Sequence, residues 1–236
     1  EMDLATKIQT VLLPNEPDLP SYRISASMIP ASSVGGDYYD VLHVDGVQWI
    51  LIGDVSGHGV TAGLTMMLVQ TAARTVLSSA GERGREITPK QLLSRVNAAV
   101  RGSIEKMSSD RYRAGMALRV EKNVVSCAGL HQDVLVYRKR SASVERIETR
   151  GIWLGLVDDI SDLLDDDSFE MAEGDTLLLY TDGVTELAVD SELLGTDGLA
   201  ALLQRLADGS AFPEVIVNGV TDRVRGGPVK DDVTVL

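Results

Sequence analysis

The chain has 236 residues, enough for one sizeable hydrophobic core, and its formal net charge of −13 argues against binding nucleic acids or anionic membranes. Cys127 is the only cysteine, which excludes an intrachain disulfide and a zinc finger, and suits a reducing cytoplasm. No run approaches about 20 apolar residues, so no membrane span is predicted.

The first predicted element is a short helix, because apolar residues across residues 4–12 follow helical spacing. Three prolines up to Pro20 then form a stiff connector. We therefore expect residues 1–20 to be a linker and residues 21–236 to be one domain. The helix either packs on that domain, or continues from an upstream domain or pairs with a second copy. The start at Glu1, without a leader sequence, favours a fragment of a longer protein.

Strands and helices follow in groups along the domain. Asp45-Gly46 is a strong hairpin signal, and Thr88 with Pro89 marks the start of a helix. Alternating or continuous apolar runs predict strands at 22–28, 38–45, 47–53, 113–120, 123–129, 133–139, 143–148, 175–181 and 233–236. Helices are predicted at about 60–78, 89–107, 183–188, 197–207 and 212–224. Such grouping indicates a mainly antiparallel structure and not βαβ units.

Aspartates mark four places where strand-like runs stop or begin. They are Asp37 after Gly35-Gly36, Asp54 after Ile52-Gly53, Asp182 after Tyr180-Thr181, and Asp231-Asp232 before the last run. Each alone can be explained as a turn or cap residue. Buried carboxylates repel one another unless a cation lies between them. If these strand ends converge, a cluster of hard divalent metal ions is expected, which can activate a water near neutral pH.

The most specific motif is the glycine-rich segment 53–59, Gly-Asp-Val-Ser-Gly-His-Gly. Glycines allow positive φ and let the backbone approach a ligand closely. A metal ion could take the Asp54 carboxylate and the backbone carbonyl of Val55, because hard ions accept this mixture of oxygen ligands. The alternative is a strand-to-helix turn in which Asp54 is a cap.

The order of these motifs resembles the metal-dependent (PPM, type 2C) serine/threonine protein phosphatases. The resemblance covers residues 4–236 and is strongest to the bacterial branch that includes SpoIIE and the phosphatases controlling alternative sigma factors. It rests on Val34-Gly35-Gly36-Asp37-Tyr38-Tyr39-Asp40, on segments 53–59 and 174–184, on Asp231-Asp232-Val233-Thr234, on Leu12-Leu13-Pro14 and on Ala128-Gly129-Leu130-His131.

The resemblance implies an α+β fold, a four-layer α-β-β-α sandwich of two mainly antiparallel sheets flanked by helices. It also implies two divalent ions, Mn²⁺ or Mg²⁺, in a cleft at one end of the sandwich. In this interpretation Asp54 bridges both ions and the Val55 carbonyl binds one of them. The ions share a water, lower its pKa and direct it at phosphorus.

The remaining site residues follow from the same resemblance. Asp182 and Asp231 bind the other ion, and Asp37 holds a metal or a metal-bound water. The four aspartates are therefore the candidate catalytic residues. Gly36, beside Asp37, is a weaker candidate. Asp232 stands where many relatives have asparagine, so we assign it a supporting role behind the ligands.

Several positions depart from the family pattern. No arginine matches the one that grips phosphate in eukaryotic relatives. His58 follows Asp54 at a longer spacing than the histidine of those relatives, so a structural turn is favoured over a leaving-group acid. Segment 112–118 lacks a threonine that relatives often have, and an extra leucine would displace His131. None of these changes removes a metal ligand.

Trp153, the acidic run 158–167 and Cys127 are three further features of the sequence. Trp153, in a glycine-bounded loop, is either a core or a docking residue. The acidic run 158–167 is a solvated loop or, alternatively, a partner contact or a gate of the cleft. Cys127 lies in a strand and is expected to be a small buried apolar residue.

Together these observations favour a cytoplasmic protein phosphatase acting on phosphoserine or phosphothreonine. By resemblance, its substrate is a phosphorylated STAS-domain anti-anti-sigma factor, an upstream sensory domain controls it, and the first helix mediates homodimerisation. One alternative is a phosphatase-like binding module without catalysis, against which the complete aspartate set argues. Another is a two-metal phosphohydrolase of nucleotides or small phosphoesters, but no P-loop motif is present.

Overall fold

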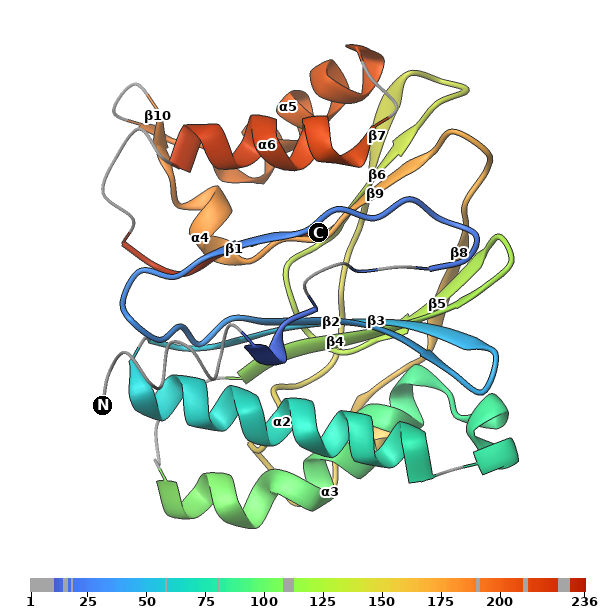
Figure 1. The fold of residues 1–236 in the computed structure, drawn as a ribbon, viewed down its shortest axis with the longest axis vertical. Coiled ribbons are helices and arrows are strands. Elements are labelled where there is room, and N and C mark those ends of the chain that lie inside the picture. The colour runs from blue at the N-terminus through green and yellow to red at the C-terminus, as the bar shows by residue number, and fades with distance from the viewer. Residues whose placement is uncertain are drawn as a thin grey trace.

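The computed structural model describes residues 11–14, 17, 19–57, 59–79, 81–107, 113–189, 192–209, 212–224 and 230–236. Helices cover both faces of a double layer of β-structure (Figure 1). One outer layer consists of α2 (Val60–Ser79) and α3 (Pro89–Met107), and the other of α5 (Gly195–Gly209) and α6 (Pro213–Val224). This is the predicted α+β sandwich of antiparallel sheets flanked by helices.

The first sheet has five antiparallel strands in the order β2-β3-β4-β5-β8. The predicted hairpin is present, because Asp45 and Gly46 adopt positive φ between its first two strands. The strands are β2 (Tyr38–Val44), β3 (Val47–Val55), β4 (Arg113–Glu121), β5 (Val124–Ala128) and β8 (Asp167–Glu170).

The second β-layer is assembled from separate segments of the chain. Backbone hydrogen bonds between Leu179 and Leu236, both 2.9 Å, join its three-stranded part to its two-stranded part. The three-stranded part has the order β7-β6-β9, and the two-stranded part pairs β1 with β12. The strands are β1 (Ser27–Ile29), β6 (Val134–Arg138), β7 (Ser143–Ile147), β9 (Thr176–Leu178) and β12 (Val233–Val235).

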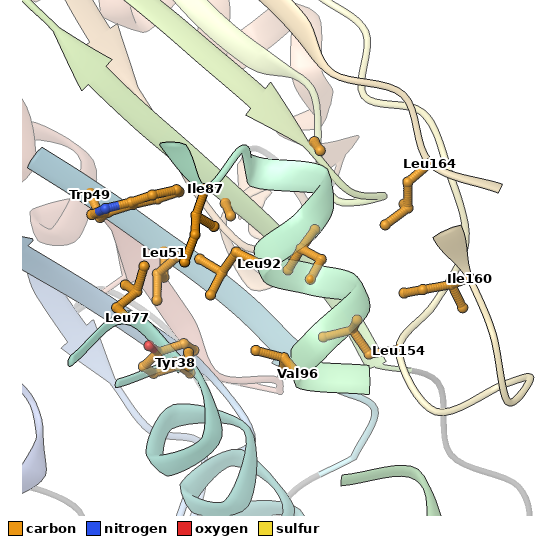
Figure 2. Packing of buried hydrophobic residues seen from close by; sticks show 14 of the residues in the cluster. Tyr38, Trp49, Leu51, Leu77, Ile87, Leu92, Val96, Leu154, Ile160 and Leu164 are labelled. Carbon is orange, nitrogen blue, oxygen red and sulfur yellow. The ribbon is translucent and has the colours of Figure 1, made fainter. Parts of the chain in front are cut away.

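Strand β3 shows how one segment serves two cores. Successive side chains of a strand point to opposite faces, so Trp49 and Leu51 face α2 and α3 while Ile50 and Ile52 face the second β-layer. Figure 2 shows the helix side of this packing, with Leu92 of α3 beside the sheet. A third core lies between the second β-layer and α5 and α6. The continuous apolar run of β3 thus reflects burial on both faces.

Helix α3 begins as the sequence predicts. The Gln91 backbone N–H donates to Thr88 Oγ1 at 3.3 Å, and the Thr88 backbone N–H donates to Gln91 Oε1 at 3.2 Å. This reciprocal pair is a capping box, with Pro89 in the first turn.

Helix α2 alone among the described helices has the length and hydropathy that would suit a membrane span. This suitability rests on length and composition only, and an apolar helix packed in a protein core has the same properties. Here Ala62, Met66 and Leu77 are buried against the first sheet and α3. This packing accounts for the apolar composition of α2.

The structure differs from the predicted elements in small ways. Residues 1–10 lie outside the described part, so the expected first helix is described only at Val11 and Leu12, which are helical. The predicted helix 183–188 is the single turn α4 (Asp182–Thr185), followed by a small hairpin of β10 (Ala188–Val189) and β11 (Glu192–Leu193). The acidic run contains a short 3-10 helix, η2 (Ser161–Leu163), and the start of β8. Another 3-10 helix, η1 (Gly81–Glu86), precedes α3. Cys127 is buried, as predicted.

Candidate metal centre and active site

Three half-buried aspartates lie near one another where both β-layers end. Asp54 lies at the end of β3, Asp182 begins α4 after β9, and Asp231 precedes β12. Burial, and then the charges of Asp182 and Asp231, raise the pKa of Asp54 to about 7. Burial, and then the charges of Asp231 and Glu186, raise the pKa of Asp182 to about 6. The strand ends therefore converge, and their carboxylates repel one another.

Asp37 occupies a different environment, between the two β-layers. Asp37 is 1% exposed, and its Oδ2 accepts hydrogen bonds from the hydroxyls of Thr181 at 2.7 Å and Thr234 at 2.6 Å. Burial, followed by the charge of Asp54, raises the pKa of Asp37 well above its ordinary value, against the lowering effect of the two threonines. Asp37 thus ties the loop before β2 to the segment after β9 and to β12.

Asp232 holds the glycine loop from the other side. Its Oδ1 accepts a hydrogen bond from the Ala31 N–H at 2.7 Å, and its Oδ2 accepts one from the Gly36 N–H at 2.5 Å. A Cβ on Gly35 would lie 2.8 Å from the same Oδ2. The buried Asp232 therefore fixes loop 31–36 by direct contact with its backbone.

Gly36 brings that loop against the glycine-rich segment. The Val55 N–H donates to the Gly36 carbonyl at 3.2 Å. A Cβ on Gly36 would lie 2.3 Å from the Val55 carbonyl oxygen and 2.9 Å from that of Gly57. Any side chain at this position would push the two carbonyl groups away, which explains why the sequence has glycine here.

Comparison with known proteins identifies the group to which the molecule belongs. Residues 45–236 match the family described as Stage II sporulation protein E (SpoIIE). The chain belongs to the SpoIIE family. SpoIIE-family proteins are type 2C serine phosphatases, so the resemblance deduced from the motifs is confirmed, as is the assignment to the phosphatases.

Two curated relatives align with the whole of this SpoIIE-family chain. The phosphoserine phosphatase RsbU of Bacillus subtilis is 27% identical over 241 residues, and the chain spans 69% of it. Protein IcfG of Synechocystis is 25% identical over 263 residues, and the chain spans 41% of it.

Solved structures show the same fold. The SiaA-PP2C domain of Pseudomonas aeruginosa superposes with a TM-score of 0.80 at 22% identity, covering 99% of this chain and 93% of that one. The RsbU and RsbW domains of Rv1364c from Mycobacterium tuberculosis give 0.69 at 22% identity, covering 92% and 62%. A structure of the phosphatase domain and a regulatory fragment of Bacillus subtilis SpoIIE gives 0.67 at 18% identity, covering 91% and 62%.

The donor atoms at this site suit the metal dependence that the SpoIIE family implies. The carboxylates of Asp54, Asp182 and Asp231 and the carbonyl of Val55 are oxygen ligands, which Mn²⁺ and Mg²⁺ prefer. The charges named above as raising the pKa of Asp54 are all negative, so a cation would stabilise the cluster. Within the described ranges, no three His, Cys, Asp or Glu side chains surround one point closely enough to form a finished ion site. The fit to hard cations thus lies in the types of the residues, which all offer oxygen ligands.

Sequence reasoning missed one carboxylate and two hydroxyls. Glu186 is exposed at the end of α4, and its charge raises the pKa of both Asp54 and Asp182. Its spacing of four residues from Asp182, one helical turn, was the available signal. Thr181 and Thr234 bind Asp37, but no local pattern indicates that their hydroxyls face one carboxylate, because their strands are distant in sequence.

The histidines contribute little to the described site. His58 lies outside the described residues. His131 has a buried Nε2 without a hydrogen-bond partner among the described residues, and burial lowers the pKa of its imidazole to about 4. The His131 backbone N–H donates to Thr149 Oγ1 at 3.1 Å, and the Thr149 hydroxyl donates to the His131 carbonyl. His131 is therefore neutral near pH 7.

Proposed function

We propose that this domain is a metal-dependent protein phosphatase that hydrolyses phosphoserine or phosphothreonine on a partner protein in the cytoplasm. The observation that carries the proposal is the convergence of Asp54, Asp182 and Asp231 from the ends of two β-layers, with the pKa of Asp54 and of Asp182 raised, in a SpoIIE-family chain. Carboxylates crowded in this way are expected where cations bind.

Asp54, Asp182 and Asp231, with the Val55 carbonyl, would hold two Mn²⁺ or Mg²⁺ ions. When bound, such ions supply a water of lowered pKa and positive charge for the phosphoryl oxygens. The carboxylates hold their positions because the backbone of β3, α4 and β12 is fixed within the sandwich. Direct attack by water needs no cysteine nucleophile, which agrees with the burial of Cys127.

Asp37 is the buried neighbour of Asp54 in this site. Its two hydrogen bonds from Thr181 and Thr234 use Oδ2 and leave Oδ1 free of these partners. That oxygen could hold a metal or orient a metal-bound water. Asp232 and Gly36 keep the adjoining loop in place, so the carbonyl of Val55 stays at the site.

The substrate and its context form the finer part of the proposal. A phosphorylated STAS-domain anti-anti-sigma factor is the proposed substrate. The relatives support it: one is a phosphoserine phosphatase named RsbU, and an RsbU domain occurs beside an RsbW domain in Rv1364c. The chain spans 69% of RsbU and 41% of IcfG, so both relatives have further segments, which agrees with the proposal of an additional, upstream sensory domain. Homodimerisation through the first helix belongs to the same proposal.

Hydrolysis of para-nitrophenyl phosphate and of a phosphoserine protein, each with Mn²⁺ and with a chelator, tests the proposal. We expect Mn²⁺-dependent turnover that disappears in Asp54→Asn. It should persist in Glu173→Gln, a control at an exposed position. Turnover that survives in Asp54→Asn would contradict the assignment. If the wild type binds Mn²⁺ by calorimetry without turning over either substrate, the domain is a phosphatase-like binding module instead.

A further inference from the structure

The loop between β7 and β8, residues 152–165, is held rigidly on α3. Three of its apolar side chains, Leu154, Ile160 and Leu164, are buried in the core formed by the first sheet and the helices (Figure 2). Loops of this length without such anchors would be mobile. This one, which we call the anchored loop, has buried side chains near its start, its middle and its end.

Hydrogen bonds fix the backbone of the anchored loop as well. The buried Asn97 of α3 accepts a hydrogen bond from the Gly155 N–H at 2.7 Å and donates to the carbonyls of Val157 and Asp158 at 3.0 Å. Directly after the loop, the Lys90 N–H donates to Asp166 Oδ1 at 2.8 Å. The surface of the loop is therefore preorganised, which lowers the entropic cost of binding a partner.

Between its anchors the loop exposes large apolar side chains. Leu156 is 53% exposed, Val157 37% and Leu163 50%. A single exposed leucine is ordinary, but several on one rigid segment mark an interaction surface.

The same surface is strongly acidic. Arg101 pairs with Asp158, and Asp159 caps the N–H of Ser161. Asp162 and Asp165 form no ion pair with any residue that the structure describes. Apart from Arg101, which pairs with Asp158, these charges have no basic neighbour in sequence, because no lysine or arginine occurs between Arg150 and Arg205. A partner bound here would need positive charge beside apolar side chains.

The anchored loop begins close to the end of β3 that carries Asp54. Leu154 lines a small cavity together with Asp54 and Gly36. Its Cδ1 lies 3.2 Å from the position that a Cβ on Gly115 would take, and Gly115 pairs with Gly53 beside Asp54. Leu156 is two residues beyond Leu154, which places the exposed part of the loop on the side of the molecule where β3 ends at Asp54 and Val55.

We propose that the anchored loop is the docking surface for the phosphoprotein substrate, recognising basic and apolar residues beside the phosphoserine. The proposal rests on the phosphatase function above. Leu156, Val157 and Leu163 contact the apolar residues, and Asp162 and Asp165 face the basic ones. The same carboxylates repel acidic phosphopeptides, which adds discrimination.

Phosphate release from two synthetic phosphoserine peptides of equal length tests this surface. One peptide has Lys and Leu beside the phosphoserine, and the other has Glu and Gly. We expect the wild type to prefer the first, and the preference in kcat/KM to fall about fivefold or more in Asp162→Lys/Asp165→Lys and in Leu156→Ser/Leu163→Ser. Turnover of para-nitrophenyl phosphate should not change, because that substrate is too small to reach the loop.

Glu173→Lys and Val215→Ser are matched controls at exposed positions outside the loop. An unchanged peptide preference in both loop variants would overturn the proposal, as would an equal loss in the controls. Analytical ultracentrifugation could instead show that the wild type is a dimer and that Leu156→Ser/Leu163→Ser is a monomer. That result would overturn the proposal, because the surface would then bind a second copy of this chain.

Fluorescence anisotropy of the labelled Lys/Leu peptide separates docking from catalysis. Binding that weakens in the loop variants supports the docking surface even when no peptide is hydrolysed, and the failure then lies with the proposed function. Turnover of para-nitrophenyl phosphate without any peptide preference would instead leave the phosphatase function intact and overturn the docking surface.

Discussion

The aspartates of this site form two groups with opposite environments. Asp37 and Asp232 are buried and receive hydrogen bonds from hydroxyls and backbone N–H groups. Asp54, Asp182 and Asp231 are half-buried, and for Asp54 and Asp182 the neighbouring charges are repulsive. Asp37 is also repelled by Asp54, but the hydrogen bonds from its two threonines oppose that effect. The same side chain therefore stabilises the scaffold in one place and leaves charge unbalanced, ready for a cation, in the other.

Removing a carboxylate from the half-buried group should have the largest effect. Asp182→Asn should lower Mn²⁺-dependent turnover of para-nitrophenyl phosphate by about a thousandfold. Its metal-free stability should be equal to or greater than that of the wild type, because a repulsive charge is lost. Steady-state kinetics and urea denaturation in chelator measure both. A strongly destabilised variant would place Asp182 with the scaffold group and break the comparison.

Adjacent residues provide the sharpest contrast between the groups. Asp232→Ala leaves the N–H groups of Ala31 and Gly36 without their buried acceptor, so unfolding free energy should fall by about 2 kcal/mol. Asp231→Ala loses mainly a bond from the neighbouring backbone and should be destabilised less. Chemical denaturation of both metal-free variants would show the difference. Equal losses would mean that the two carboxylates share one role.

The half-buried group should also set how the metal-free protein responds to pH. The folded-state pKa values of Asp54 and Asp182 lie above the ordinary value of 3.8, so the folded state holds more protons than the unfolded state. Stability should consequently fall as pH rises through the interval from about 4 to about 7. Asp54→Asn/Asp182→Asn should show a smaller fall. Denaturation midpoints across this interval test it, and a rise specific to the wild type would contradict it.

The smallest effect is expected where a neutral hydroxyl supports a buried carboxylate. Thr234→Val removes one hydrogen bond to Asp37 while keeping the side-chain shape, and should lower the unfolding free energy by about 1 kcal/mol. It should also reduce turnover by about tenfold, because Asp37 loses its orientation. Thr65→Val, buried within α2, is the control that should affect stability without this loss of activity.

Much of the fold follows from local signals in the sequence. Asp45-Gly46 specifies a hairpin because positive φ is needed at both positions, and Thr88 specifies a helix start because its side chain satisfies a free N–H. The apolar run of β3 predicts a strand buried on both faces. Strand β8 was missed, because its acidic, exposed residues carry no apolar alternation at the edge of the sheet.

The sequence by itself determined that four aspartate positions end or begin strands, and the motif order placed them in a phosphatase family. Only the tertiary structure decided which carboxylates are anchored and which are left repelling one another. Asp231 and Asp232 illustrate the reason. Adjacent side chains on an extended segment point in opposite directions, and the direction that meets loop 31–36 depends on strands far away in the chain. Local patterns carry no information about such distant partners.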